Sequence, residues 1–118
     1  MDTSRYAELF RSEAREHLVN IDQALAAMRR GEHVEPVAEL FRSTHTIKGM
    51  AAAMGYAGVE QLAHALESVL DSVRTNARDV DDELLHLLLD GADALATAVD
   101  NATAPSEPGV KPGGDRLP

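Results

Sequence analysis

Apolar residues recur every three or four positions along most of the chain, which is the spacing of one face of an α-helix. Four such stripes run through residues 3–30, from Pro36 to Met54, through residues 59–73, and from the acidic cluster 79–83 to Val99. Their members are Tyr6, Phe10, Ala14, Leu18, Ile21, Leu25 and Met28; Val37, Leu40, Phe41, Thr44, Ile47, Ala51 and Met54; Val59, Leu62, Ala63, Leu66, Val69, Leu70 and Val73; and Leu84, Leu85, Leu88, Ala92, Leu95, Ala96 and Val99.

Residues that start and stop helices separate these stripes. The polar residues 2–4 are candidate N-caps, and Gly31 suits the end of the first helix. Pro36 is favoured in a first helical turn, and Gly55 and Gly58 bracket a short turn. No run alternates with the period of a β-strand. The pattern predicts an all-α fold, an antiparallel up-down four-helix bundle with room for a short extra helix.

The composition supports one domain with a tail. A chain of 118 residues can bury one core, and with only 3% aromatic residues that core is mainly aliphatic. Four of the five prolines and three of the eight glycines lie in residues 104–118. We therefore expect a helical domain over residues 1–103 and a flexible linker or tail over 104–118. The absence of cysteine excludes disulfides and thiolate sites.

Charge narrows the range of partners. The formal net charge of −9 disfavours binding to nucleic acid and to anionic membranes. The N-terminus has charged residues where a signal peptide needs an apolar run, and no stretch reaches the ~20 apolar residues of a membrane span. We expect a cytoplasmic protein that does not insert into a membrane.

The segment STHTIKGMAAAMG, residues 43–55, carries the candidate chemistry. His45 falls roughly 120° from the centre of the apolar stripe of its helix, so it lies on the flank and not in the core. Gly49 and Ala52, on the same flank, are small. A glycine inside a helix costs about 1 kcal/mol relative to alanine, so Gly49 needs a reason. Two explanations for Gly49 remain open: it allows a partner to approach closely, or it allows tight helix packing within this protein.

The third helix brings a carboxylate to the same place. If the turn is centred near Tyr56, His45 lies eleven residues before it and Glu67 eleven after, so an antiparallel hairpin puts them at the same height. His64 lies one turn nearer the loop. A carboxylate can accept one imidazole N–H and leave the other nitrogen as a nucleophile for a phosphoryl group. Lys48 is a nearby cation for an arriving phosphoryl group, or simply a solvated lysine.

The segments THTIKG and AHALESVLDSVR together resemble the histidine phosphotransfer (HPt) family, most of all the N-terminal P1 domains of the chemotaxis histidine kinases CheA, over roughly residues 5–100. The resemblance implies that His45 is phosphorylated and that Glu67 orients its ring. It gives Lys48 and His64 supporting roles and makes Gly49 the small residue that allows partner access. Ala52 and Arg42 lie on the same flank by helical spacing, so we expect them to border the approach of the partner. Met50 departs from the family, many of whose members have a small residue there.

The resemblance also implies the partners. An ATP-binding histidine kinase domain, in the same parent chain or its dimer mate, would phosphorylate His45, and an aspartate of a response regulator receiver domain would accept the group. This chain has no glycine-rich nucleotide loop. By itself it is expected to be a phosphoryl carrier without a cofactor, with ATP and magnesium on the kinase domain, even though the parent chain resembles a histidine kinase.

Three other interpretations compete with phosphotransfer. In the first, the chain is a structural or scaffolding bundle and His45 is an incidental surface residue. In the second, His45, His64 and Glu67 bind a metal ion, although no H-x-x-x-H pair is present. In the third, His45 is the general base of a hydrolase, but Ser43 points elsewhere on the helix and no oxyanion loop is visible.

Overall fold

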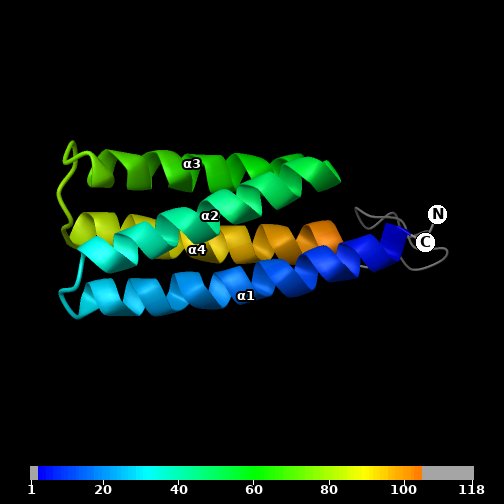
Figure 1. Cartoon of the computed structure of the whole chain (residues 1–118), viewed down its shortest axis with the longest axis horizontal. Helices are drawn as coiled ribbons and strands as arrows, with labels where there is room; N and C mark the ends of the chain where they lie inside the picture. Colours follow the sequence, from blue (N-terminus) through cyan, green and yellow to red (C-terminus); the bar gives the residue numbers. More distant parts are fainter. Residues whose placement is uncertain (1–2, 105–118) are drawn as a thin grey trace, which may run out of the picture.

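The computed structural model describes residues 3–104, which form four α-helices: α1 (Thr3–Arg29), α2 (Val34–Met54), α3 (Ala57–Arg74) and α4 (Asp82–Thr103). Figure 1 shows the helices lying lengthwise beside one another. Contacts join α1 to α2 and α4, and α3 to the same two helices, so the chain closes a ring of four. The predicted four-helix bundle is confirmed, and residues 3–104 contain neither a further helix nor a strand. Of the predicted tail, residues 104–118, all but Ala104 lies outside the described residues.

The core is built almost entirely from the predicted apolar stripes. Its largest fully buried side chains are Ile21, Leu25, Met28, Ile47, Leu70, Leu84, Leu88 and Leu95, with Val59, Val99 and Thr44. The expectation for Tyr6 is wrong, because this residue is 51% exposed. The first turns of α1 extend past the ends of α3 and α4 (Figure 1), so a stripe position there has fewer neighbours to bury it.

The turn between α2 and α3 occupies only two residues, Gly55 and Tyr56. Gly55 has a φ of 76°, a left-handed conformation that costs glycine little, and the Tyr56 N–H donates to the Ala51 carbonyl at 2.9 Å. Tyr56 also packs edge-to-face on Phe10 of α1, with ring centroids 5.0 Å apart. Gly58 does not bracket the turn, because α3 already begins at Ala57. This short, anchored turn sets the register of the α2–α3 hairpin.

Two other helix starts follow local signals. Asp81 caps α4 by accepting a hydrogen bond of 2.8 Å from the Leu84 N–H, so the acidic cluster opens this helix as predicted. Helix α2 begins at Val34, two residues before the predicted start. Pro36 lies in its first turn, where the missing proline N–H would have no partner inside the helix.

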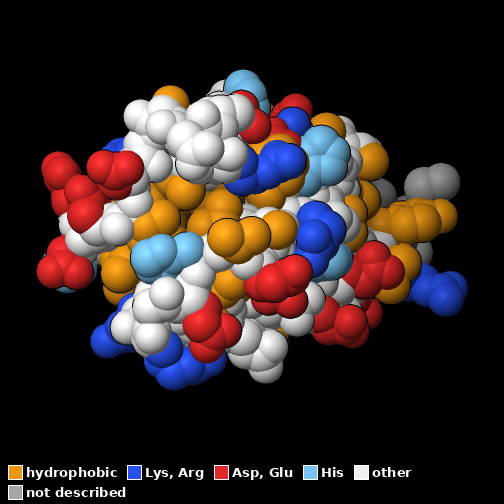
Figure 2. Space-filling view, turned by 60° about the vertical axis from the view of Figure 1, so that its left-hand side comes forward, with side chains coloured by type: hydrophobic (Ala, Val, Ile, Leu, Met, Phe, Trp, Pro, Cys, Tyr) orange, Lys and Arg blue, Asp and Glu red, His pale blue; other side chains and the backbone are white. Residues whose placement is uncertain are grey.

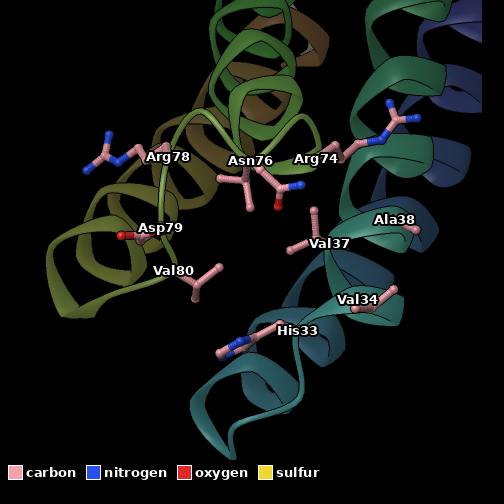
Figure 3. Close-up of a pocket in the computed structure, with 10 residues that line it drawn as sticks. His33, Val34, Val37, Ala38, Arg74, Asn76, Arg78, Asp79 and Val80 are labelled. Carbon is pink, nitrogen blue, oxygen red and sulfur yellow. The ribbon is translucent and has the colours of Figure 1, made fainter.

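A hollow of about 630 Å³ lies at one end of the bundle, between the start of α2 and the segment that joins α3 to α4. Figure 2 looks toward this end and shows hydrophobic side chains within it, with charged and histidine side chains around them. In Figure 3, Val37 and Val80 face the hollow from opposite sides.

Candidate functional site

Helices α2 and α3 bring three of the predicted site residues into contact. His45 and Lys48, one turn apart on α2, both bind the carboxylate of Glu67 on α3. The imidazole Nδ1 is hydrogen-bonded to Glu67 Oε2, and the Lys48 ammonium donates to Oε1 at 2.6 Å. The predicted pairing of His45 with Glu67 at the same height of the hairpin is therefore confirmed.

Glu67 is the buried member of this cluster. Its side chain is 11% exposed, against 27% for Lys48 and 62% for His45. The hydrogen bond from Lys48 lowers the pKa of Glu67 below its ordinary value of 4.5, and His45 lowers it further, while burial opposes both. The carboxylate is thus ionised at neutral pH and can only accept hydrogen bonds.

An acceptor-only Glu67 determines how the imidazole is protonated. The hydrogen of the bond to Glu67 must be carried by Nδ1, so in the neutral ring Nε2 holds the free lone pair. Within residues 3–104, Nε2 of His45 makes no hydrogen bond. The exposed side chain therefore presents Nε2 as a nucleophile, while the buried Glu67 holds the other ring nitrogen, Nδ1.

Gly49, one turn after His45, leaves the surface beside the imidazole open. A Cβ atom placed on Gly49 meets no atom within 4 Å, so this glycine is not needed for tight packing inside the protein. Of the two explanations that the sequence leaves open, internal packing is wrong. Ala52 and Arg42 are also exposed, and the Arg42 side chain forms no ion pair with any described residue.

His64 and Lys48 differ from their predicted arrangement. His64 is exposed and forms no hydrogen bond or ion pair with His45, with Glu67 or with any other described residue, so its supporting role stays a prediction. Lys48 is not simply a solvated lysine, because it is half-buried and bonded to Glu67. Its contact is with the carboxylate that holds the ring, and this contact needs no phosphoryl group.

Sequence reasoning assigned Phe41 to the core stripe and gave Arg74 no role. Phe41 lies parallel to the His45 ring, and the Arg74 guanidinium lies over the Phe41 ring. The position of Phe41 four residues before His45 could have indicated the first contact, since residues at that spacing are neighbours on a helix surface. The contact with Arg74 depends on how α3 packs against α2.

The other chemistries find no support among the described residues. Residues 3–104 contain no group of three or more histidine, aspartate or glutamate side chains placed to hold a metal ion. Ser43 is buried, 6% exposed, and so is not presented to a substrate beside His45. None of the four described helices is long and apolar enough to cross a membrane.

Comparison with protein families gives a match that covers most of the chain. Residues 5–100 match the model of the Hpt domain. The chain belongs to the Hpt domain family. This match includes all three residues of the cluster, and its limits agree with those of the resemblance seen in the sequence.

The similar curated proteins are chemotaxis proteins CheA. The chain is 36% identical to CheA of Bacillus subtilis over 100 residues, which cover 84% of this chain and 15% of that protein. It is 39% identical to CheA of Listeria monocytogenes over 98 residues, covering 82% of this chain and 16% of that protein. The Hpt domain described here is thus of the CheA type and spans about one sixth of the length of these relatives.

Solved structures of CheA domains have the same fold. The CheA phosphotransferase domain from Thermotoga maritima superposes with a TM-score of 0.81 at 31% identity, covering 88% of this chain and all of that one. The phosphorylated P1 domain of CheA3 in complex with CheY6 from R. sphaeroides gives a TM-score of 0.80 at 28% identity, covering 86% and 80%. The P1-type Hpt bundle predicted from the sequence is confirmed.

Proposed function

We propose that this Hpt domain carries a phosphoryl group on Nε2 of His45, between an ATP-binding histidine kinase domain and a receiver domain of a response regulator. The observation that carries the proposal is the pairing of His45 Nδ1 with the buried, ionised Glu67. Burying a carboxylate costs free energy unless other groups compensate its charge. A bundle with only a scaffolding role would gain nothing from burying one against an exposed histidine.

Each transfer is a displacement at phosphorus. The Nε2 lone pair forms a P–N bond, the bond from the γ-phosphorus to its bridging oxygen breaks, and the electron pair leaves with ADP. In the second step a carboxylate oxygen of the receiver attacks phosphorus, the P–N bond breaks, and the pair returns to Nε2. ATP and Mg²⁺ belong to the partner kinase domain in this scheme.

The surface around His45 suits both partners in turn. The imidazole is 62% exposed, and Gly49 adds no side chain on the C-terminal side of the ring. A partner active site can therefore approach Nε2 closely. The R. sphaeroides CheA3 P1 domain, whose structure contains CheY6, is similar over 86% of this chain, which supports a CheY-type receiver as the acceptor.

Phosphorylation by a CheA kinase domain tests the proposal. With ATP and Mg²⁺, the full chain should acquire an acid-labile, base-stable phosphoryl group that a receiver domain then removes. His45→Gln should abolish the label with the helical circular dichroism unchanged. His86→Gln, at another exposed histidine, should keep it. A label that persists in His45→Gln, or a wild-type chain that takes none, would contradict the proposal.

A further inference from the structure

The ring of His45 lies against a second aromatic ring from its own helix. Phe41, one turn earlier on α2, has its ring centroid 6.2 Å from that of His45, and the two planes differ by 5°. Parallel rings at this separation are offset, which is one of the arrangements that aromatic pairs prefer. The N-terminal side of the imidazole therefore has an aromatic neighbour, whereas Gly49, one turn after His45, adds no side chain and has open space around it.

Arg74 of α3 completes this arrangement from the other helix. Its guanidinium carbon lies 4.1 Å from the centroid of the Phe41 ring, within the range of a cation–π contact. Figure 3 shows the Arg74 side chain turned away from the hollow and along α2. Its ion pair with Asp71, at 3.8 Å, is long and exposed and so constrains it little. Arg74 contacts Phe41 and Phe41 contacts His45, and this set of contacts, called here the three-residue stack, joins α3 to α2.

The hydrogen bond to Glu67 leaves one freedom of the imidazole unconstrained. It restrains Nδ1, but the ring can still tilt by coupled rotation about the Cα–Cβ and Cβ–Cγ bonds as the hydrogen bond bends. The His45 side chain is 62% exposed, so packing by the core does not stop the tilt. A parallel ring beside the imidazole does oppose it, because tilting separates the two planes. Phe41 is half-buried and packs against the core, and the guanidinium over its ring is a further contact that holds it.

We propose that Phe41 and Arg74 are positioning residues that hold the plane of the His45 ring and direct the approach to Nε2 to the side of Gly49. This inference rests on the proposed phosphotransfer function. Reacting atoms must be aligned as well as close, so loss of the stack slows the phosphoryl transfer itself. Binding of the partner domains is unaffected, because the three-residue stack acts through His45.

Transfer from a small donor separates positioning from docking. Phosphoramidate transfers its phosphoryl group as the P–N bond to ammonia breaks and the bond to Nε2 forms, without any protein surface. Arg74→Met, which keeps the length of the side chain but not its charge, should lower this rate on the order of tenfold. The loss with the CheA kinase domain should be similar and should appear in kcat, with KM unchanged. Arg74→Lys should recover most of the rate.

Arg78 provides the matched control. It lies at the same end of the bundle, and in Figure 3 its side chain points away from α2. Arg78→Met should transfer phosphoryl groups at the wild-type rate. If Arg74→Met matches Arg78→Met with phosphoramidate, or is slow only with the kinase domain, positioning by the three-residue stack is wrong. In the second case Arg74 is a docking residue.

A structural readout tests the stack without any phosphorylation. In nuclear magnetic resonance spectra of the full chain, Arg74→Met should weaken the Overhauser contacts between the ring protons of Phe41 and His45, and Arg78→Met should not. Unchanged contacts in Arg74→Met would overturn the inference. A wild-type chain that shows the contacts but accepts no phosphoryl group would contradict the proposed function and leave the ring geometry standing.

Discussion

Two carboxylates of this bundle each bind two basic side chains on a neighbouring helix, yet they differ in surroundings. Glu67 joins α3 to α2 through His45 and Lys48, and the residue is 9% exposed. Asp100 joins α4 to α1 through Arg15 at 3.2 Å and Arg11 at 3.6 Å, and about half of its side chain is in water. The number of partners is the same, so burial distinguishes the two clusters.

Burial changes what an ion pair can do. Water screens the Asp100 cluster, and exposed pairs of this kind contribute between about 0 and 1 kcal/mol. Around Glu67 there is little water to replace a lost partner, so its contacts are held, and the hydrogen bond from Lys48 lowers its pKa even though burial opposes this shift. A fixed, ionised acceptor can orient an imidazole. The Glu67 cluster is suited to a catalytic role, and the Asp100 cluster links two helices.

The largest difference should appear in the rate of phosphorylation. Glu67→Gln replaces the anion by an amide that can present its NH₂ group to Nδ1, so we expect the rate at His45 to fall roughly tenfold to a hundredfold. Asp100→Asn should change it by less than about twofold. Single-turnover labelling by a CheA kinase domain measures both. Equal rates for the two variants would remove Glu67 from the mechanism.

Removing the charge of Lys48 should destabilise the protein more than removing the charge of Arg15. Lys48→Met leaves an oxygen of the buried carboxylate without its donor, which should lower the free energy of unfolding by about 1–2 kcal/mol. Arg15→Met removes an exposed pair and should cost about 0.5 kcal/mol or less. Urea unfolding at neutral pH gives both values, and the comparison fails if Arg15→Met is the more damaging change.

The contribution of Glu67 to the free energy of unfolding should decrease in acid. The folded-state pKa of Glu67 lies below the ordinary value of 4.5, so its contribution to stability is complete above pH 4.5 and is lost as the pH falls through the folded-state value. Glu67→Gln should therefore lose less stability than the wild type between pH 4.5 and strongly acidic solution. Thermal midpoints across this range test the sign, which parallel curves would refute.

The smallest effect concerns salt. Because the Asp100 pairs are exposed, the stability difference between wild type and Asp100→Asn should be at most about 0.5 kcal/mol and should vanish in about 1 M sodium chloride. The difference for Lys48→Met should persist there, since its partner is buried. A salt-sensitive Lys48→Met would show that the two clusters are alike.

The sequence predicted the helices and the main pair of the site for identifiable reasons. Helical spacing and the short turn at Tyr56 set the register of α2 and α3, and this register places His45 opposite Glu67. Both signals are local in the chain. Counting residues around a hairpin was enough to predict this contact.

The remaining features depend on how helices pack, which spacing alone does not specify. Three features can be predicted only when the distance and relative rotation of α2 and α3 are known. They are the burial of Glu67, the hydrogen bond that Lys48 donates to it, and the position of Arg74 over Phe41. The exposure of Tyr6 depends on where the neighbouring helices end. His64 was assigned by its side of α3, and in the described residues it forms no hydrogen bond or ion pair with the cluster.

The central claim is that His45 receives the phosphoryl group on Nε2 while Glu67 holds Nδ1. Nuclear magnetic resonance of the phosphorylated full chain, labelled with nitrogen-15, tests it through the coupling between phosphorus and the ring nitrogens. The account predicts a single phosphohistidine at His45, with phosphorus coupled to Nε2 and a proton retained on Nδ1. Coupling to Nδ1, or a phosphoryl group on another histidine, would contradict it.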